Sequence, residues 1–329
     1  MMENRTFAGI DVGTTTTKAV IINADKELLG RCVRRSGADL ASAVTAAFEE
    51  AIARAGIGRD MIQAIVATGY GRKNVPFDKL RAGSFDKLTA TSTRGGRAGS
   101  FDKLPLAEST PSKVEGLGTD RAGSFDLGRN IHLNAVEPLR ASSFVHSTRT
   151  EIGCHAQGCY HYFPEAITVV DVGGQDSKIT KLDVQGRRVG FKMNRKCAAG
   201  TGAFLEEIAH KLDIPVGDLN ELAKAASKTA QIGSYCTVFT ATEVLDRIRA
   251  GEKIDDIVRG LFDSVAKRIL EMDTLAGRVI MTGGVVAFND IVADLLSARA
   301  GVKVEIAPHP QEMGAFGAAL FAERLFSSQ

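Results

Sequence analysis

The sequence lacks three features that would each point to a familiar class of protein. Its formal net charge is only +2, so the charge balance indicates neither a nucleic acid nor an anionic membrane as the main partner. No apolar run approaches the length of a transmembrane helix, and residues 1–5 lack the apolar core of a signal peptide. The P-loop pattern G-x-x-x-x-G-K-S/T is absent, which excludes that class of nucleotide-binding protein. We therefore expect a cytoplasmic protein that binds neither nucleic acid nor membrane.

Cysteines are also few, with five among 329 residues: Cys32, Cys154, Cys159, Cys197 and Cys236. In a cytosolic chain they are not expected to form a disulfide framework, so metal binding or plain burial is expected instead. The remaining composition, 44% hydrophobic and 24% charged, is that of an ordinary soluble protein. A chain of this length has room for two domains.

One short stretch combines a thiol with a turn that suits an anion. Cys197 lies just ahead of Gly200-Thr201-Gly202, and apolar residues recur at helical spacing behind this turn. Thr201 is the expected N-cap of that helix. The free N–H groups of a helix N-terminus suit a phosphate, and they also favour the thiolate form that binds metal. The alternative is a glycine-rich turn beside a buried cysteine.

The N-terminal part is predicted to start with a β-hairpin. Strands at residues 7–11 and 17–22 are joined by a turn that is too short for a crossover helix, so the two strands must be antiparallel. This argues against a Rossmann unit, which needs a strand, a turn and a helix. A strand at residues 27–33, a helix at 39–55 and a buried strand at 62–67 are predicted to follow.

Order is predicted to resume at residue 151. The expected strands cover residues 166–172, 177–182, 188–193, 278–281 and 302–306. The expected helices follow the Gly-Thr-Gly turn, then lie around residues 218–227, from 243, at 254–275, at 290–300 and from 314. Residues 236–239 are expected to be a short β-like run.

Residues 78–149 break the pattern. The octapeptide Arg-Ala-Gly-Ser-Phe-Asp-Lys-Leu at 81–88 recurs intact at 97–104 and in part at 121–127. The spacings of 16 and 24 residues are unequal, so this is not a regular solenoid. The surroundings are rich in Ser, Thr, Gly, Arg and Lys, which predicts a largely disordered insertion. A recognition tail is the alternative.

Two stretches of the chain carry the same hairpin pattern. Asp11-Val12-Gly13 followed by Thr17-Lys18 matches Asp171-Val172-Gly173 followed by Ser177-Lys178 at the same offsets. Two copies indicate two related domains that face one ligand. Turn glycines let backbone N–H groups approach phosphate oxygens, and threonine hydroxyls add donors. Together with Thr282-Gly283-Gly284, the pair predicts a nucleotide site.

The candidate site residues follow from these turns. Asp11 and Asp171 stand where strands end and could hold Mg²⁺ through water, and Gln175 could orient an attacking water. The candidates for phosphate binding are the small and basic residues of the turns: Gly13, Thr14, Thr15, Thr16, Lys18, Gly173, Gly174, Gly200, Thr201, Gly202, Gly283 and Gly284.

These motifs resemble a known family. The hairpins, the Gly-Gly turn and the alanine-rich helix from Gly314 look like the actin, heat-shock chaperone and sugar-kinase superfamily. More closely, four segments are similar to the activators of 2-hydroxyacyl-CoA dehydratases and to the ATPase subunits of benzoyl-CoA reductases. The segments are residues 171–178, 196–202, 236–239 and 281–284. Arg195 departs from the acidic residue usual there, and the family passes almost directly from the part like residues 69–77 to the part like residues 150–152.

The resemblance implies an α/β fold of two actin-like (ribonuclease H-like) ATPase domains with a nucleotide cleft between them. It implies domain I at residues 1–77, the insertion at 78–149, domain II at 150–306 and a C-terminal helix at 307–329 that returns to domain I. It also implies that Cys197 and Cys236 bind one 4Fe–4S cluster shared across a homodimer, because two thiolates are half of the usual set. A rival metal site is the C-x₄-C pair Cys154 and Cys159, while Cys32 is expected to be structural.

The implied function is an ATP-hydrolysing activator. It would bind ATP or ADP with Mg²⁺, take an electron from a ferredoxin or flavodoxin, and pass it at low potential to a 2-hydroxyacyl-CoA dehydratase or benzoyl-CoA reductase component. A small-molecule kinase of the same superfamily is the alternative, and an actin-like filament former is a third possibility. Neither alternative needs Cys197 and Cys236.

Overall fold

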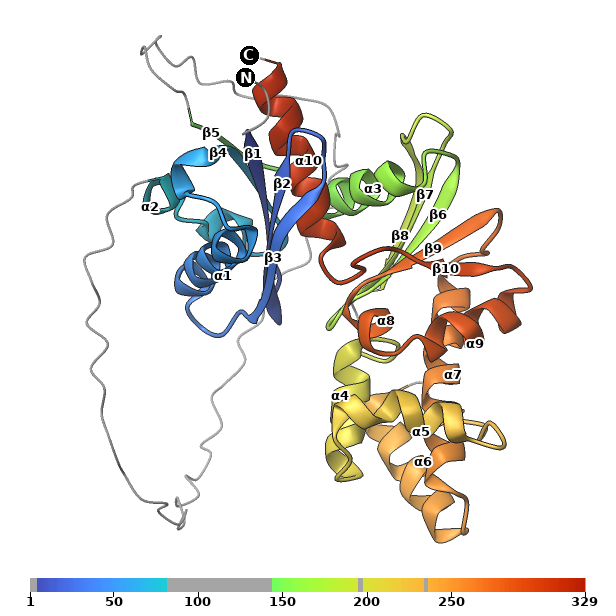
Figure 1. The fold of residues 1–329 in the computed structure, drawn as a ribbon. Coiled ribbons are helices and arrows are strands. Elements are labelled where there is room, and N and C mark those ends of the chain that lie inside the picture. Colours follow the sequence, from blue (N-terminus) through green and yellow to red (C-terminus); the bar gives the residue numbers. More distant parts are fainter. Residues whose placement is uncertain (1–4, 82–143, 195–197, 234–235, 329) are drawn as a thin grey trace, which may run out of the picture. The chain divides into compact units, whose positions relative to one another are not determined.

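The computed structural model describes residues 5–81, 144–194, 198–233 and 236–328 (Figure 1). All of the described helices and strands belong to one compact unit.

Two mixed five-stranded sheets have the same strand order. In the N-terminal sheet the order is β3 (Leu28–Arg35), β2 (Thr16–Asn23), β1 (Thr6–Val12), β4 (Ile62–Thr68) and β5 (Val145–Thr148). In the C-terminal sheet it is β8 (Arg188–Asn194), β7 (Ser177–Leu182), β6 (Ile167–Val172), β9 (Arg278–Thr282) and β10 (Val304–Ile306). The central strand β1 pairs antiparallel with β2 and parallel with β4, and β6 likewise pairs antiparallel with β7 and parallel with β9. This confirms the two predicted hairpins and the actin-like α/β fold.

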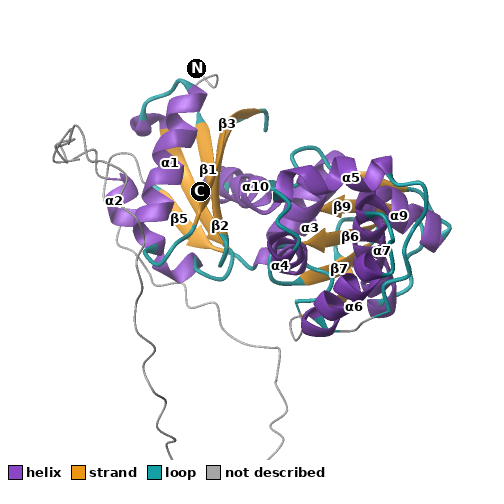
Figure 2. Ribbon diagram, turned by 90° about the horizontal axis from the view of Figure 1, so that it is seen from below, coloured by secondary structure: helices purple, strands orange, loops and turns teal. Residues whose placement is uncertain are grey.

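The N-terminal sheet is covered on both faces, and β1 shows why. Its odd-numbered residue Phe7 belongs to the core under α10 (Met313–Ser327), whereas Ala8 and Ile10 belong to the core under α1 (Leu40–Ala55). Successive side chains of a strand point to opposite faces, so a strand buried on both sides must be apolar throughout. Figure 2 shows β1 and β2 between these two helices.

The ends of α1 follow from local sequence. Asp39 accepts a hydrogen bond from the Ser42 backbone N–H at 3.1 Å, and Gly56 ends the helix with a φ of 66°. These are the N-cap and C-cap residues that helix termini favour. The buried stripe is Val44, Ala47, Phe48, Ala51 and Ile52.

Helix α10 is held by close backbone contacts with two other elements. A Cβ atom on Gly9 of β1 would collide with the Ala315 carbonyl oxygen, and one on Gly317 would collide with the Cys154 carbonyl oxygen of α3 (Glu151–Tyr162). A Cβ atom on Gly158 of α3 would lie 2.7 Å from the Met313 carbonyl oxygen. Glycine is therefore required where α10 crosses β1 and α3.

The remaining helices accompany the C-terminal sheet. They are α4 (Gly202–Lys211), α5 (Leu219–Ala225), α6 (Thr237–Arg249), α7 (Ile254–Met272), α8 (Gly284–Phe288) and α9 (Ile291–Ala300). The N-terminal part adds the short helix α2 (Phe77–Arg81). Single turns of 3₁₀-helix lie at Arg59–Met61, Arg72–Asn74 and Val216–Asp218.

Two sequence predictions were wrong. Residues 236–239 are not β-like, because α6 begins at Thr237. Residues 145–148, inside the stretch 78–149 expected to be disordered, form β5 and pair in parallel with β4 from Ala64 to Ala67. Most of that stretch, residues 82–143, lies outside the described residues.

This boundary can be tested with two deletions. Replacing residues 85–142 by a short Gly-Ser linker keeps β5, whereas replacing residues 85–149 removes the strand that pairs with β4. We expect the longer deletion to have the lower melting temperature, by about 2–4 °C for each kcal/mol lost. Thermal unfolding followed by circular dichroism measures this difference. Equal melting temperatures would show that β5 adds nothing to the sheet.

Candidate active site

The two matched hairpins have the same geometry. Asp11 of β1 lies opposite Lys18 of β2, and Asp171 of β6 lies opposite Lys178 of β7. The Lys18 Nζ is 3.0 Å from Asp11 Oδ2, and the Lys178 Nζ is 3.4 Å from Asp171 Oδ2. The turns also match: Gly13 N–H donates to the Thr16 carbonyl at 3.0 Å, and Gly173 N–H donates to the Asp176 carbonyl at 2.9 Å. The spacing of seven residues between aspartate and lysine in each hairpin therefore forms an ion pair in each sheet.

The match extends to the strand beside each hairpin. Asp11 pairs with Thr68 of β4, and Asp171 pairs with Thr282 of β9. A glycine with positive φ follows each threonine, Gly69 at 85° and Gly283 at 101°. A Cβ atom there would lie 2.5 Å from Asp11 Oδ1 and 2.7 Å from Asp171 Oδ1, respectively. Sequence reasoning used the second Thr-Gly pair and missed the first, although both follow a buried apolar strand.

The second hairpin holds the richer set of charges. Lys178 Nζ also lies 3.0 Å from Glu151 Oε1 and 2.5 Å from Asp176 Oδ1. Burial alone would lower the pKa of Lys178, but Asp171, Glu151 and Asp176 outweigh it and raise the pKa above its usual value. Lys18 behaves alike, since Asp11 outweighs burial and raises its pKa. Both ammonium groups therefore stay charged.

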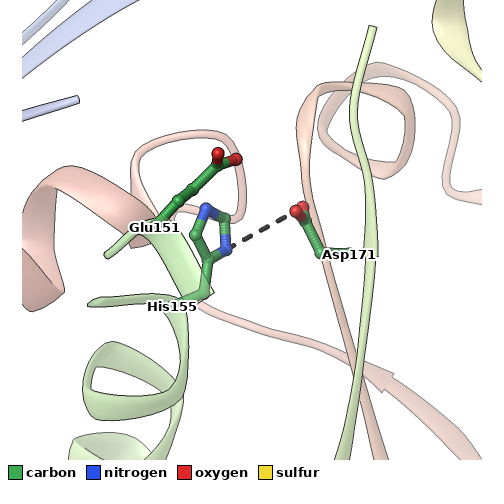
Figure 3. A group of neighbouring side chains, drawn as sticks. All are labelled: Glu151, His155 and Asp171. Carbon is green, nitrogen blue, oxygen red and sulfur yellow. Dashed lines mark ion pairs between the residues drawn. The ribbon is translucent and has the colours of Figure 1, made fainter. Parts of the chain in front are cut away.

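The two aspartates differ in their partners. Asp171 Oδ1 accepts a hydrogen bond from Thr282 Oγ1 at 3.3 Å and lies 3.8 Å from His155 Nδ1 (Figure 3). Burial would raise the pKa of Asp171, but His155, Lys178 and Lys18 together lower it. Asp11 is only 3% exposed, and its Oδ1 has no hydrogen-bond partner among the described residues. A buried carboxylate oxygen without a donor suits a cation or a water bound to one.

The Gly-Thr-Gly turn lies against the second hairpin. Gly202 and Ala203 N–H donate to the carbonyls of Gly173 and Gly174 at 2.9 and 2.8 Å. These two N–H groups at the start of α4 are therefore occupied, contrary to our expectation that they are free for phosphate. Thr201 stands at the N-cap position, but its hydroxyl donates to the Ala198 carbonyl at 2.6 Å instead of capping the helix.

The structure brings most of the predicted phosphate-binding turns together. A Cβ atom on Gly174 would lie 3.0 Å from Thr15 Oγ1, so the turns of the two hairpins are adjacent. One on Gly202 would lie 3.5 Å from Val285 Cγ2 of α8, whose N-cap is Gly283. Thr14 and Gln175 are exposed in their turns. Among the described residues, no hydrogen bond orients the Gln175 side chain toward Asp11 or Asp171.

Cys236, the described member of the predicted cluster pair, is half-buried. It is the N-cap residue of α6, and its carbonyl oxygen accepts the Thr240 N–H at 2.9 Å. A thiol at a helix N-terminus is a suitable donor to an anionic iron–sulfur cluster. Cys197 lies outside the described residues.

The rival pair Cys154 and Cys159 does not form a metal site in the described structure. Both thiols are buried in α3, and burial raises the pKa of Cys154 to about 12 and that of Cys159 further. Among the described residues, the His, Cys, Asp and Glu side chains that converge are Glu151, His155 and Asp171, with ligand atoms within 4.8 Å of one another. Neither cysteine belongs to this group.

Glu151, His155 and Asp176 are the site residues that sequence reasoning missed. His155 lies within the C-x₄-C pair, next to Cys154. The available signal was the spacing of four between Glu151 and His155, which places both on one face of a helix. Nothing in the sequence says that this face meets Asp171.

The burial of the thiols predicts their reactivity. Only the thiolate reacts with iodoacetamide, and raised pKa values keep Cys154, Cys159 and Cys32 protonated at pH 8; for Cys32 the pKa rises to about 11, mainly through burial. We expect Cys236 to be alkylated first in the native apoprotein. Timed labelling with peptide mass spectrometry measures this order, and labelling in denaturant is the control. Equal native rates at all four positions would contradict the described burial.

The chain matches one family model in two segments. Residues 8–95 and 131–322 match the model of the BadF/BadG/BcrA/BcrD ATPase family. The stretch between the two matched segments, residues 96–130, is shorter than the insertion expected at residues 78–149. The activator of lactoyl-CoA dehydratase from Anaerotignum propionicum is 33% identical, covering 95% of this chain and 96% of its own.

Two solved structures resemble the whole chain. Component A of (R)-2-hydroxyglutaryl-CoA dehydratase from Acidaminococcus fermentans has a TM-score of 0.74 and 28% identity, covering 98% of this chain and 99% of its own. The activator of 2-hydroxyisocaproyl-CoA dehydratase from Clostridium difficile, with bound ADPNP, has a TM-score of 0.71 and 27% identity, covering 98% and 96%. In the described part of this chain, no helix is long and apolar enough to cross a membrane. This chain belongs to the BadF/BadG/BcrA/BcrD ATPase family.

Proposed function

We propose that this ATPase is an iron–sulfur activator that hydrolyses ATP and passes a low-potential electron to a partner enzyme acting on CoA thioesters. The partner class is a 2-hydroxyacyl-CoA dehydratase or a benzoyl-CoA reductase component, because relatives that match nearly the whole chain are named as activators of such dehydratases. The donor would be a ferredoxin or a flavodoxin, and the compartment the cytoplasm.

The duplicated hairpin carries the nucleotide part of this proposal. The turns at Gly13 and Gly173 would contact the phosphates, with Gly283 and Gly284 beside them. Asp11 and Asp171 would hold Mg²⁺ through water, and the unpartnered Oδ1 of Asp11 fits this role. The ion would neutralise charge on the phosphates during transfer. Ion pairs with Lys18 and Lys178 hold the two carboxylates in place.

The cysteines carry the redox part. Cys197 and Cys236 of one subunit would supply two thiolates, and the same pair of a second subunit would complete a 4Fe–4S cluster. The half-buried position of Cys236 at the start of α6 supports this, since a shared cluster needs thiols near a surface. The buried Cys154 and Cys159 do not meet that need.

The test is anaerobic analysis of iron and acid-labile sulfide in the purified full chain. We expect about four irons per dimer in the parent protein, and almost none after Cys197→Ser or Cys236→Ser, because each change removes half of the ligands from the dimer. The matched controls Cys154→Ser and Cys159→Ser should keep the iron. Loss of iron in the controls alone would move the cluster to α3, and a parent protein free of iron would refute the redox part.

A further inference from the structure

His155 occupies a buried position between the two hairpins. It lies in the second turn of α3, one helical turn after Glu151, and is 8% exposed. Figure 3 shows Glu151 and His155 projecting from this helix toward Asp171 at the end of β6.

The two nitrogens of the imidazole ring face different neighbours. On one side, Nδ1 lies 3.4 Å from Thr282 Oγ1, the hydroxyl that donates to Asp171 Oδ1. On the other side, Nε2 faces Gly314, where a Cβ atom would stand 2.7 Å from it and 3.3 Å from Asp11 Oδ2. Among the described residues, the polar partners of the ring are therefore Thr282 and Asp171.

The packing around His155 keeps the ring there. Gly314 is the second residue of α10, and any side chain on it would displace the imidazole. The helix that carries His155 is fixed on α10 by the close contact of Gly158 with Met313. The packing of α3 on α10 therefore fixes the backbone that carries His155.

The convergence of Glu151, His155 and Asp171 does not call for a further metal ion. The Lys178 ammonium lies 3.0 Å from Glu151 and 3.4 Å from Asp171, so a positive charge already stands between these carboxylates. A second cation at that point would be repelled. The ring is better placed to orient Asp171 than to bind a metal itself.

We propose that His155 is a positioning residue for ATP hydrolysis. Through Thr282 it fixes the orientation of the Asp171 carboxylate. A small rotation of this carboxylate would misplace the water or ion that it holds, and groups that orient such ligands affect activity strongly. The inference rests on the proposed nucleotide role of the two aspartates.

The test is the rate of ATP hydrolysis by His155→Ala, His155→Asn and His155→Gln in the full chain. The asparagine amide can stand in for Nδ1, and the glutamine amide for Nε2. We expect alanine and glutamine to lower kcat about 10- to 100-fold, the usual effect of losing an orienting group. The KM for ATP should change less than about threefold, because binding of the ground state is retained. Asparagine should restore most of kcat.

The matched control is His161→Asn on the same helix. The His161 ring packs on Tyr162 and Phe316 with centroids 5.1 and 5.4 Å away, and its kcat should equal that of the parent. A kcat of His155→Ala within about twofold of the parent would overturn the proposal. Equal losses in all three His155 variants with equal drops in melting temperature would do so too. Asp171→Asn distinguishes failure of the His155 proposal from failure of the proposed nucleotide site. If Asp171→Asn leaves kcat unchanged, both proposals are wrong. If Asp171→Asn lowers kcat but the His155 variants do not, only the proposal for His155 is wrong.

Discussion

A buried carboxylate facing a lysine across an antiparallel strand pair is the interaction on which the site depends. It occurs once in each sheet, as Asp11 with Lys18 and as Asp171 with Lys178. A buried charge without a partner is strongly unfavourable, so each pair fixes the register of its hairpin. The register places a tight turn beside each carboxylate, and the neighbouring parallel strand must then end in a glycine, Gly69 or Gly283.

The two hairpins differ in the groups that surround their aspartates. The Asp171 carboxylate contacts Lys178, Thr282 and His155, so it is fixed by the protein. The Asp11 copy has a lysine alone, and Oδ1 lacks a donor among the described residues. One carboxylate is held by the protein and the other keeps an oxygen for a ligand. Helix α3 connects them because it packs on α10, which in turn packs on β1.

Local sequence predicts the hairpins well and the tertiary contacts poorly. Asp11 and Lys18 meet because of an offset within one hairpin, and the same holds for Asp171 and Lys178. His155 meets Asp171 only because α3 is placed by α10, far along the chain. Residues 236–239 were mistaken for a β-like run because β-branched and aromatic residues dominate them. In the structure Val238 and Phe239 are 67% and 69% exposed, so these apolar residues of α6 do not mark a buried helix face. The strand β5 was missed because four residues beside a repeat-rich stretch carry too little pattern.

We infer that the nucleotide state would reach the proposed cluster through the Gly-Thr-Gly turn. The N–H groups of Gly202 and Ala203 tie α4 to the turn of the second hairpin, and Cys197 precedes Gly200 by three residues. Coupled sites differ typically by about 1–3 kcal/mol between states, or about five- to 150-fold. The most direct measurement is anaerobic release of iron to a chelator with ATP, with ADP and with no nucleotide. The account predicts faster release with ATP than with ADP, and identical traces under all three conditions would contradict it.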